Sequence, residues 1–186
     1  MSTSRQHLIE LLAARSARRG SFTLASGKHS SFYIDARLTT MSPEGLTAIG
    51  AVGLSVLRER QWDADAVGGL TLGADPVSYA ISYASASTAT PIRAFTVRKE
   101  AKTHGTGKLI EGPFRANDRV VVIEDVITTG GSALRAIEAL RAASGQVIGV
   151  LAVVDREEGG REAIEAIGVP VASLTRVSEI LALLPS

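Results

Sequence analysis

Two kinds of hydrophobic pattern alternate along most of the chain. Short continuous apolar stretches predict buried strands at residues 66–70, 92–97, 119–124, 147–154 and 169–174. Between them, apolar residues recur every three or four positions, which predicts helices at residues 43–62, 75–85, 133–144 and 162–167. Ser42 as the N-cap and Pro43 at the first helical position mark the start of the first of these helices. Because strands alternate with helices, the pattern predicts an α/β fold with a mainly parallel, doubly wound sheet flanked by helices.

The N-terminal part has a different pattern, and we expect a small substructure there. Three leucines within residues 8–12 lie at helical spacing, and this helix is expected to end near Gly20, where two arginines and the glycine suit a C-terminus. Aromatic stretches around Phe22 and Phe32 then flank a polar turn, which predicts two short strands. No repeat or linker divides the chain, so we expect one domain over residues 1–186, with this substructure in about its first 40 residues.

The composition excludes several classes of protein. The 186 residues carry 20 Lys and Arg against 19 Asp and Glu, a net charge of +1, which excludes a protein held to nucleic acid mainly by its overall charge. The absence of cysteine excludes disulfides, a thiol nucleophile and Cys-ligated zinc, and it favours a reducing compartment. No stretch approaches the ~18 apolar residues of a membrane span, and Glu10 and Arg15 interrupt any signal peptide. We expect a cytoplasmic protein with no nucleic-acid or membrane partner.

The most informative segment runs from Val120 to Ser132. A buried strand leads into the acidic pair Glu124-Asp125, and open α/β sheets bind their ligands at this carboxyl edge. Residues 128–132, rich in Thr and Gly, then open a helix, where glycines allow close approach and backbone N–H groups favour a phosphate. Because carboxylates accept hydrogen bonds from vicinal hydroxyls, the segment predicts a site for a ribose 5-phosphate. The alternative is an ordinary strand–turn–helix connection with Thr and Ser as helix caps.

These thirteen residues resemble the phosphoribosyl pyrophosphate (PRPP) signature of the type I phosphoribosyltransferases. The resemblance implies that family's fold, with the N-terminal substructure as a small hood, a loop that binds the 5-phosphate and an acidic pair that binds the ribose hydroxyls. It also implies Mg²⁺ as the cofactor, held mainly through PRPP. In this segment the implied PRPP-binding residues are Glu124, Asp125, Val126, Ile127, Thr128, Thr129, Gly130, Gly131 and Ser132.

A second segment, residues 93–108, concentrates positive charge. Its five cations stand against Glu100 alone, a net charge of +4 that leaves the rest of the chain at −3. Closely spaced cations next to glycines suit a leaving pyrophosphate, which needs both charge neutralisation and a loop that opens for its release. The alternative is a solvated charged loop.

The order of residues in this segment is more specific than its charge. Residues 97–105 resemble the mobile catalytic loop of the orotate phosphoribosyltransferases. The residues that would contact the pyrophosphate are then Arg98, Lys99, Lys102 and His104. The resemblance further implies Lys102, His104 and Asp125 as catalytic residues, and a homodimer in which the loop at about residues 98–110 reaches the site of the neighbouring subunit.

Orotate carries a ring carboxylate, so a site for it should offer a fixed arginine. Arg156 follows a predicted strand at the ligand edge of the sheet; a surface ion pair with a neighbouring glutamate is the alternative. The resemblance implies Arg156 and Thr128 as orotate contacts. The stretch 22–35 resembles the family's hood, in which Tyr33 and Ile34 would face orotate.

Two positions depart from the family's pattern. Ala25 and Leu72 stand where many relatives carry lysines that meet the phosphates of the donor. Lys28 could compensate for one of them, and Asp75 fits either a helix N-cap or a contact to the donor or to Mg²⁺.

The implied reaction transfers the phosphoribosyl group of PRPP to orotate, giving orotidine 5′-phosphate and pyrophosphate in de novo pyrimidine biosynthesis. Orotate is already anionic, so positioning and charge stabilisation should suffice without a strong base. The sequence leaves three alternatives: a purine or uracil as acceptor, a PRPP-sensing regulator that binds RNA or DNA, and a structural module that binds a ribose phosphate. The net charge of −3 outside residues 93–108 argues against the regulator, because a regulator would need a basic surface separate from the site to bind RNA or DNA.

Overall fold

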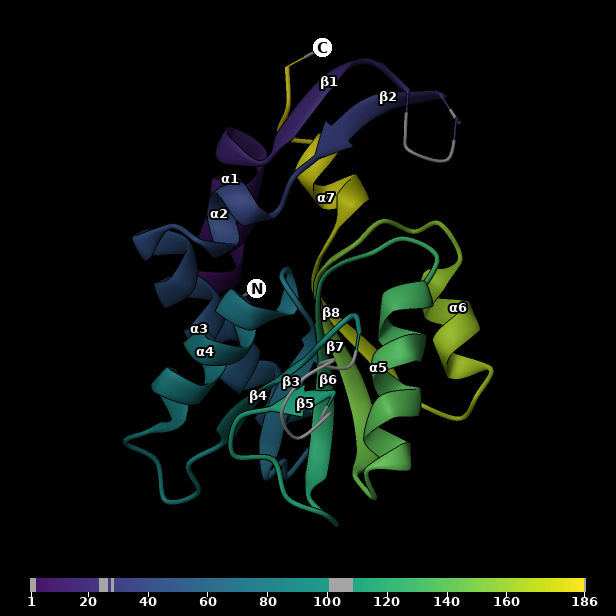
Figure 1. Ribbon diagram of the computed structural model, residues 1–186. Helices are drawn as coiled ribbons and strands as arrows, with labels where there is room; N and C mark the ends of the chain where they lie inside the picture. Colours follow the sequence, from purple (N-terminus) through teal and green to yellow (C-terminus); the bar gives the residue numbers. More distant parts are fainter. Residues whose placement is uncertain (1–2, 24–26, 28, 101–108, 186) are drawn as a thin grey trace.

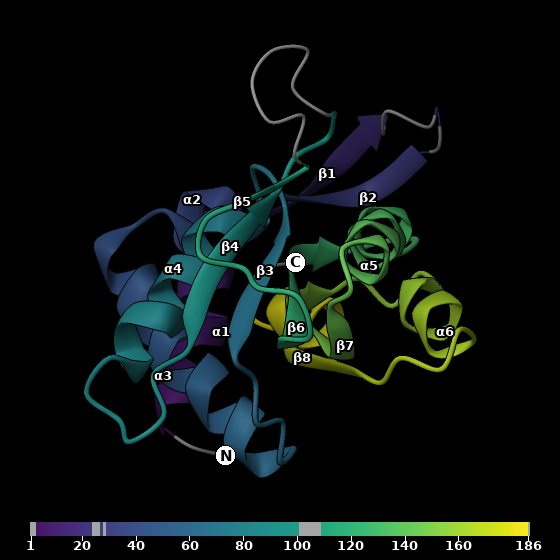
Figure 2. The ribbon, with the colours of Figure 1, turned by 60° about the horizontal axis from the view of Figure 1, so that its bottom comes forward.

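The computed structural model describes residues 3–23, 27, 29–100 and 109–185. The strands of its main sheet are β3 Ala66–Leu70, β4 Arg93–Val97, β5 Ile110–Glu111, β6 Arg119–Ile127, β7 Gln146–Asp155 and β8 Val171–Arg176. They form six strands in the order β5-β4-β3-β6-β7-β8, all parallel to their neighbours except β5, which is antiparallel to β4 (Figure 1 and Figure 2). The predicted α/β fold with a mainly parallel sheet is confirmed.

Helices cover both faces of the sheet. The longer ones are α1 Thr3–Arg15, α3 Pro43–Glu59, α4 Ala74–Ser85 and α5 Gly131–Ala142, and the shorter ones are α2 Arg37–Thr40, α6 Gly160–Glu165 and α7 Val177–Leu181. The helices α1, α3 and α4 pack on one face and α5 and α6 on the other, each group over its own hydrophobic core (Figure 1). None of the described helices is both long enough and apolar enough to cross a membrane.

The central strand β6 contributes to both cores because successive side chains of a strand point to opposite faces. Val121 is buried in the core under α1, α3 and α4, and Val122 in the core under α5 and α6. The predicted end of this strand at Glu124 is wrong, since β6 continues to Ile127 and pairs with β7 up to Asp155. The acidic pair therefore lies within the strand rather than beyond its end.

The two predicted N-terminal strands are present as an antiparallel hairpin, β1 Ala17–Thr23 and β2 His29–Ile34, which is separate from the main sheet (Figure 1). The prediction that the first helix extends to about Gly20 is wrong, because α1 ends at Arg15 and the next two arginines belong to β1. Backbone pairing across the hairpin outweighs the helix-ending signal of those arginines, as tertiary context commonly overrides local propensity.

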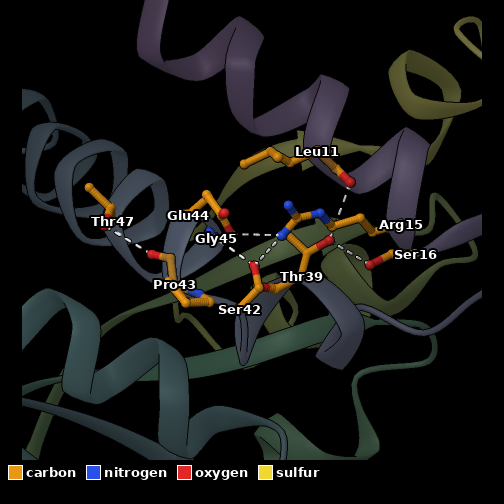
Figure 3. Close-up of polar contacts among 9 residues, drawn as sticks. All are labelled: Leu11, Arg15, Ser16, Thr39, Ser42, Pro43, Glu44, Gly45 and Thr47. Atoms are coloured by element: carbon orange, nitrogen blue, oxygen red, sulfur yellow. Dashed lines mark hydrogen bonds and ion pairs between the residues drawn. The ribbon is translucent and has the colours of Figure 1, made fainter.

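Polar contacts fix the base of the hairpin to the body of the protein (Figure 3). Arg15 donates to the Ser42 hydroxyl at 2.8 Å and to the Glu44 carboxylate at 2.9 Å, which ties α1 to the start of α3. The Ser42 hydroxyl also accepts from the Gly45 N–H at 3.1 Å and so caps α3 as predicted. Ser16 shares a hydrogen bond of 2.7 Å with a threonine hydroxyl of α2. The hairpin thus extends from three interlocked helices.

The remaining predicted elements agree with the structure to within three residues at each end. At the end of α5, Ser144 takes the left-handed conformation with φ +64°, and the Gly145 N–H donates to the Leu140 carbonyl at 2.8 Å. A Cβ at Gly145 would lie 3.1 Å from the Phe114 ring, so close packing explains this glycine.

Candidate active site

Two adjoining cavities lie at the carboxyl ends of β6 and β7. The first, about 490 Å³, is lined by Glu124 and by the loop between β6 and α5. The second, about 390 Å³, is lined by the end of the hairpin, by the acidic pair and by Arg156. Both cavities are lined by Glu124 and Thr128, so they lie side by side at this edge of the sheet. This is the sheet edge at which the sequence predicted ligand binding.

The loop between β6 and α5 has the conformation of an anion site. Gly130 lies immediately before α5 with φ +81°, and a Cβ there would lie 2.8 Å from the Gly160 carbonyl oxygen, so this position requires glycine. The alternative of a connection capped by Thr and Ser is wrong, because α5 has no side-chain cap bond. Gly131 and Ser132 line the cavity at the first turn of α5, whose N–H groups have no partner within the helix and suit an anion.

The acidic pair lies on both sides of the end of β6. Glu124 lies on the α5 side, where it lines the first cavity together with Arg135, and Asp125 lies on the α4 side, against the N-cap residue Gly73. Glu124 is 7% exposed, and among the described residues its Oε1 atom has no hydrogen-bond partner. The Asp125 carboxylate packs against Gly73, where a Cβ would lie 2.5 Å away, and it accepts the Val126 N–H at 2.9 Å. The two carboxylates therefore flank a ligand placed over the strand end.

Burial controls the charge of both carboxyls in the ligand-free protein. Burial, together with repulsion by Asp125, raises the pKa of Glu124 to about 8, against a lowering contribution from Arg135. Burial also raises the pKa of Asp125, although the Val126 N–H and the charge of Arg37 act to lower it. A ligand that brings hydroxyl donors or a cation to these oxygens would offset the cost of ionising them.

The pKa of Glu124 predicts a pH dependence of stability. The folded protein keeps this proton up to about pH 8, whereas the unfolded chain loses it near pH 4.5, so the stability contributed by this group falls as pH rises between these values. Glu124→Gln should remove the effect. Its free energy of unfolding should exceed that of the wild type by an amount that grows with pH, levels off above pH 8 and reaches at most about 5 kcal/mol. Thermal unfolding of both ligand-free proteins between about pH 5 and pH 9 measures the difference; a constant difference would contradict the assignment.

Arg156 follows the last residue of β7 and turns inward. It is 9% exposed, and its guanidinium lies over the Phe32 ring of the hairpin, 5.0 Å from the centroid. The alternative of an ion pair is present, since Nε donates to Glu158 at 2.8 Å. The pair is not a surface feature, however, because the arginine is buried and lines the second cavity. Phe32, which the sequence analysis named only as part of a predicted strand, thus contacts the Arg156 side chain.

The structure brings together the described residues that were predicted for the two substrates. The predicted orotate contacts Tyr33, Ile34, Thr128 and Arg156 all line the second cavity. The first cavity is lined by the predicted PRPP-binding residues Glu124, Val126, Ile127, Thr128, Thr129, Gly130, Gly131 and Ser132, and Asp125 lines the second.

The basic segment is only partly within the described chain. Lys99 lines the second cavity, as expected for a residue near the donor. Arg98 does not line either cavity, and instead donates from Nε to the Glu100 carbonyl at 3.4 Å and lies 3.6 Å from Glu111. The predicted contacts Lys102 and His104 lie outside the described residues, as do Ala25 and Lys28.

The sequence analysis missed an arginine in the wall of the second cavity. Arg37 binds the Asp35 carboxylate with two hydrogen bonds of 2.8 and 2.9 Å, and both residues line the cavity beside the exposed Leu72. The sequence feature that could have pointed to this arginine is the order Asp35-x-Arg37 directly after β2. Asp75 is not a helix N-cap, since it accepts hydrogen bonds from Thr71 at 2.6 Å and from a threonine of β4 at 2.8 Å.

Comparison with known proteins gives this fold and site a class. Residues 62–172 match the phosphoribosyl transferase domain family, so the protein is a phosphoribosyltransferase. An orotate phosphoribosyltransferase of Aquifex aeolicus is 48% identical over 180 residues, which cover 95% of this chain and 97% of that protein. The Mycobacterium tuberculosis orotate phosphoribosyltransferase in complex with PRPP has a TM-score of 0.81 and 40% identity, over 95% of this chain and 98% of that one. The chain belongs to the orotate phosphoribosyltransferase family.

Proposed function

We propose that the protein transfers the 5-phosphoribosyl group of PRPP to orotate, giving orotidine 5′-phosphate and pyrophosphate in de novo pyrimidine biosynthesis. The observation that carries this function is the buried Arg156, which shares a cavity with Tyr33 and Ile34 and adjoins the phosphate loop. Its planar guanidinium can bind the ring carboxylate of orotate with two hydrogen bonds. The names of the relatives support the same acceptor.

The donor lies across the end of β6 in this proposal. The loop around Thr129 and Gly130 and the first turn of α5 bind the 5-phosphate. Glu124 and Asp125 accept hydrogen bonds from the ribose hydroxyls. Because the two carboxylates approach from opposite sides, they orient the ring and stabilise the positive charge that develops at its anomeric carbon.

Mg²⁺ is part of the proposal. In the described part of the chain, no group of three or more His, Cys, Asp or Glu side chains could hold a metal ion. Mg²⁺ needs no such cage here, because it commonly uses one or two carboxylates together with substrate phosphates and water. The buried Oε1 atom of Glu124, which has no partner within the described residues, and the adjacent Asp125 fit this partial ligation. Bound with PRPP, the cation would neutralise charge on the pyrophosphate.

The basic segment completes the site. Arg98, Lys99, Lys102 and His104 bind the leaving pyrophosphate, and Lys102 and His104 act as catalytic residues with Asp125; the position of Lys99 in the second cavity supports this placement. The loop at about residues 98–110 reaches the neighbouring site of a homodimer. The chain acts as one domain in the cytoplasm, with the hairpin as its hood.

The chemistry is a displacement at the anomeric carbon with inversion. Orotate supplies its own negative charge, so no side chain is assigned as a general base. Arg156 and the hairpin place the orotate ring, while the acidic pair and the phosphate loop place the ribose. Positioning of this kind removes much of the entropic cost of bringing two substrates together.

Orotate consumption that requires both PRPP and Mg²⁺, and that releases pyrophosphate, tests the proposed function. Arg156→Ala should raise the KM for orotate by about 10²-fold, because hydrogen bonds to charged groups contribute about 1.5–3 kcal/mol. Arg156→Lys keeps the charge without the planar fork and should give an intermediate KM. The KM for PRPP should stay within about threefold of the wild type in both variants.

The same measurements separate the alternatives. An unchanged KM for orotate in Arg156→Ala would remove Arg156 from the orotate site. Turnover of a purine or of uracil in place of orotate would change the acceptor while leaving the donor site intact. Absence of turnover with any of these bases, alongside PRPP binding, would favour a regulator.

A further inference from the structure

A cavity separate from the active site gathers positive charge. It has a volume of about 490 Å³ and is lined by Arg5, Arg60, Arg161 and Arg176, together with two serines and Glu179. The arginines come from α1, the end of α3, α6 and the end of β8, so the folded chain assembles them from four distant segments. None of its lining residues lines either cavity of the active site. We refer to it as the arginine cavity.

Carboxylates neutralise only part of this charge. Arg5 binds Glu179 through Nη2 at 2.7 and 3.0 Å. Arg161 binds Asp155 through Nε at 3.0 Å and lies 3.5 Å from a glutamate of α6. The Arg60 side chain has no hydrogen bond or ion pair to any residue that the structure describes, and Arg176 contacts Glu179 through its backbone N–H. Positive charge therefore remains at the exposed rim of the cavity, at Arg60 and, partly offset by the nearby Glu179 carboxylate, at Arg176.

We propose that the arginine cavity binds a small phosphate-bearing anion. Guanidinium groups are the side chains best suited to phosphate, because their planar fork donates two parallel hydrogen bonds. A phosphate monoester carries close to two negative charges at neutral pH, which matches the two rim arginines. The hydroxyls of Ser173, which accepts from Arg161 Nη2 at 3.2 Å, and of Ser178 also line the cavity and can donate to an anion.

The wall of the arginine cavity is joined to the turn that carries Arg156. Asp155 accepts from Arg161 through one carboxylate oxygen and, through the other, from the Glu157 N–H at 2.9 Å. Glu157 in turn accepts the Ser178 N–H at 3.1 Å, and its backbone has φ +58°, which is uncommon outside glycine. An anion that draws Arg161 away from Asp155 loosens this turn and changes the affinity for orotate. This second effect rests on the proposed function of Arg156, whereas anion binding itself does not.

Calorimetric titration of the full chain with inorganic phosphate counts the sites. The double variant Arg60→Ala/Arg176→Ala should bind one phosphate fewer per chain than the wild type, because it changes the arginine cavity and leaves the proposed active-site contacts intact. The matched variant Arg58→Ala/Arg141→Ala removes two exposed arginines that line neither cavity and should bind as many phosphates as the wild type. Equal numbers in the wild type and the Arg60/Arg176 variant, or the same loss in the matched variant, would overturn the site.

A parallel titration with adenosine 5′-monophosphate identifies the source of the phosphate. Binding to the arginine cavity at least about tenfold tighter than that of inorganic phosphate would indicate a phosphate ester, and equal affinity would indicate the free ion.

Initial rates at saturating PRPP measure the effect on the active site. Added phosphate should change the KM for orotate at least about threefold in the wild type and leave it unchanged in the Arg60/Arg176 variant, whose kcat without phosphate should equal that of the wild type. An equal response in both proteins would refute the link to Arg156. If the proposed function is wrong, none of these proteins should turn over orotate, but the number of phosphates that each binds in the calorimetric titration should be unaffected.

Discussion

Replacing Glu124 by Gln and Asp125 by Asn in one protein should lower kcat/KM for PRPP by about 10²–10³-fold, because two charge-assisted hydrogen bonds are weakened and each contributes about 1.5–3 kcal/mol. The amides keep the shape of the carboxyls and remain acceptors, so the ring still fits over the end of β6. The loss of negative charge is felt most in the transition state, when the ribose becomes cationic. Steady-state rates at saturating orotate measure the change.

Stability distinguishes loss of the site from loss of the fold in this variant. Since burial raises the pKa of both carboxyls, the neutral amides remove a cost that the folded wild type carries near pH 8. The ligand-free double variant should therefore have a higher Tm than the wild type at that pH. A stable variant that keeps kcat/KM within about threefold of the wild type would remove the acidic pair from the proposed donor site.

Gly130→Ala should raise the KM for PRPP by about 10–10²-fold and lower the free energy of unfolding by about 2 kcal/mol or more. Its φ of +81° disfavours any side chain, and the new Cβ would lie 2.8 Å from the Gly160 carbonyl oxygen. Relief of this clash must displace the loop that is proposed to bind the 5-phosphate. Titration with PRPP and thermal unfolding measure the two effects.

Gly159→Ala provides a matched control. Gly159 has a similar φ of +87°, but a Cβ there would meet no atom within 4 Å. Both variants therefore carry the backbone cost of a left-handed alanine, about 1 kcal/mol, and only Gly130→Ala carries the clash. The KM for PRPP should be unchanged in Gly159→Ala. A similar rise in both variants would show that the loop position does not depend on the contact between Gly130 and Gly160.

The sequence predicted elements well where a local signal and tertiary packing agree. The start of α3 is an example, because Ser42 accepts the capping hydrogen bond that its place before Pro43 predicts. The phosphate loop is another, since its glycines and its position after a buried strand required a tight turn at the ligand edge. The residues expected to bind the two substrates were found in adjoining cavities for the same reason, as the carboxyl ends of parallel strands meet at one edge.

The sequence did not predict the structural features that depend on contacts between segments far apart in the chain. The hairpin begins at Ala17 because β1 pairs with β2, which no periodicity within the first twenty residues could show. The short elements α2 and β5 are too brief to produce a pattern. Arg37 was missed because only the folded chain shows that it lines the second cavity together with Asp35. The buried position of Arg156 was missed for a similar reason, since its guanidinium packs against Phe32, which belongs to another element.

The separation of the hairpin from the main sheet has a consequence for how this protein can change. The proposed phosphate and sugar contacts belong to one continuous stretch of chain, β6 through the start of α5, whereas the proposed base-reading side chains come from the hairpin and from the end of β7. The hairpin forms its own two-stranded sheet and shares no strand with the main one. A substitution at the exposed hairpin residue Tyr33 can therefore alter which base is accepted without disturbing either hydrophobic core, whereas Ile34 is itself part of the core under α1, α3 and α4. Inheritance of a fixed donor half and a variable acceptor half would let one scaffold give rise to enzymes for different bases.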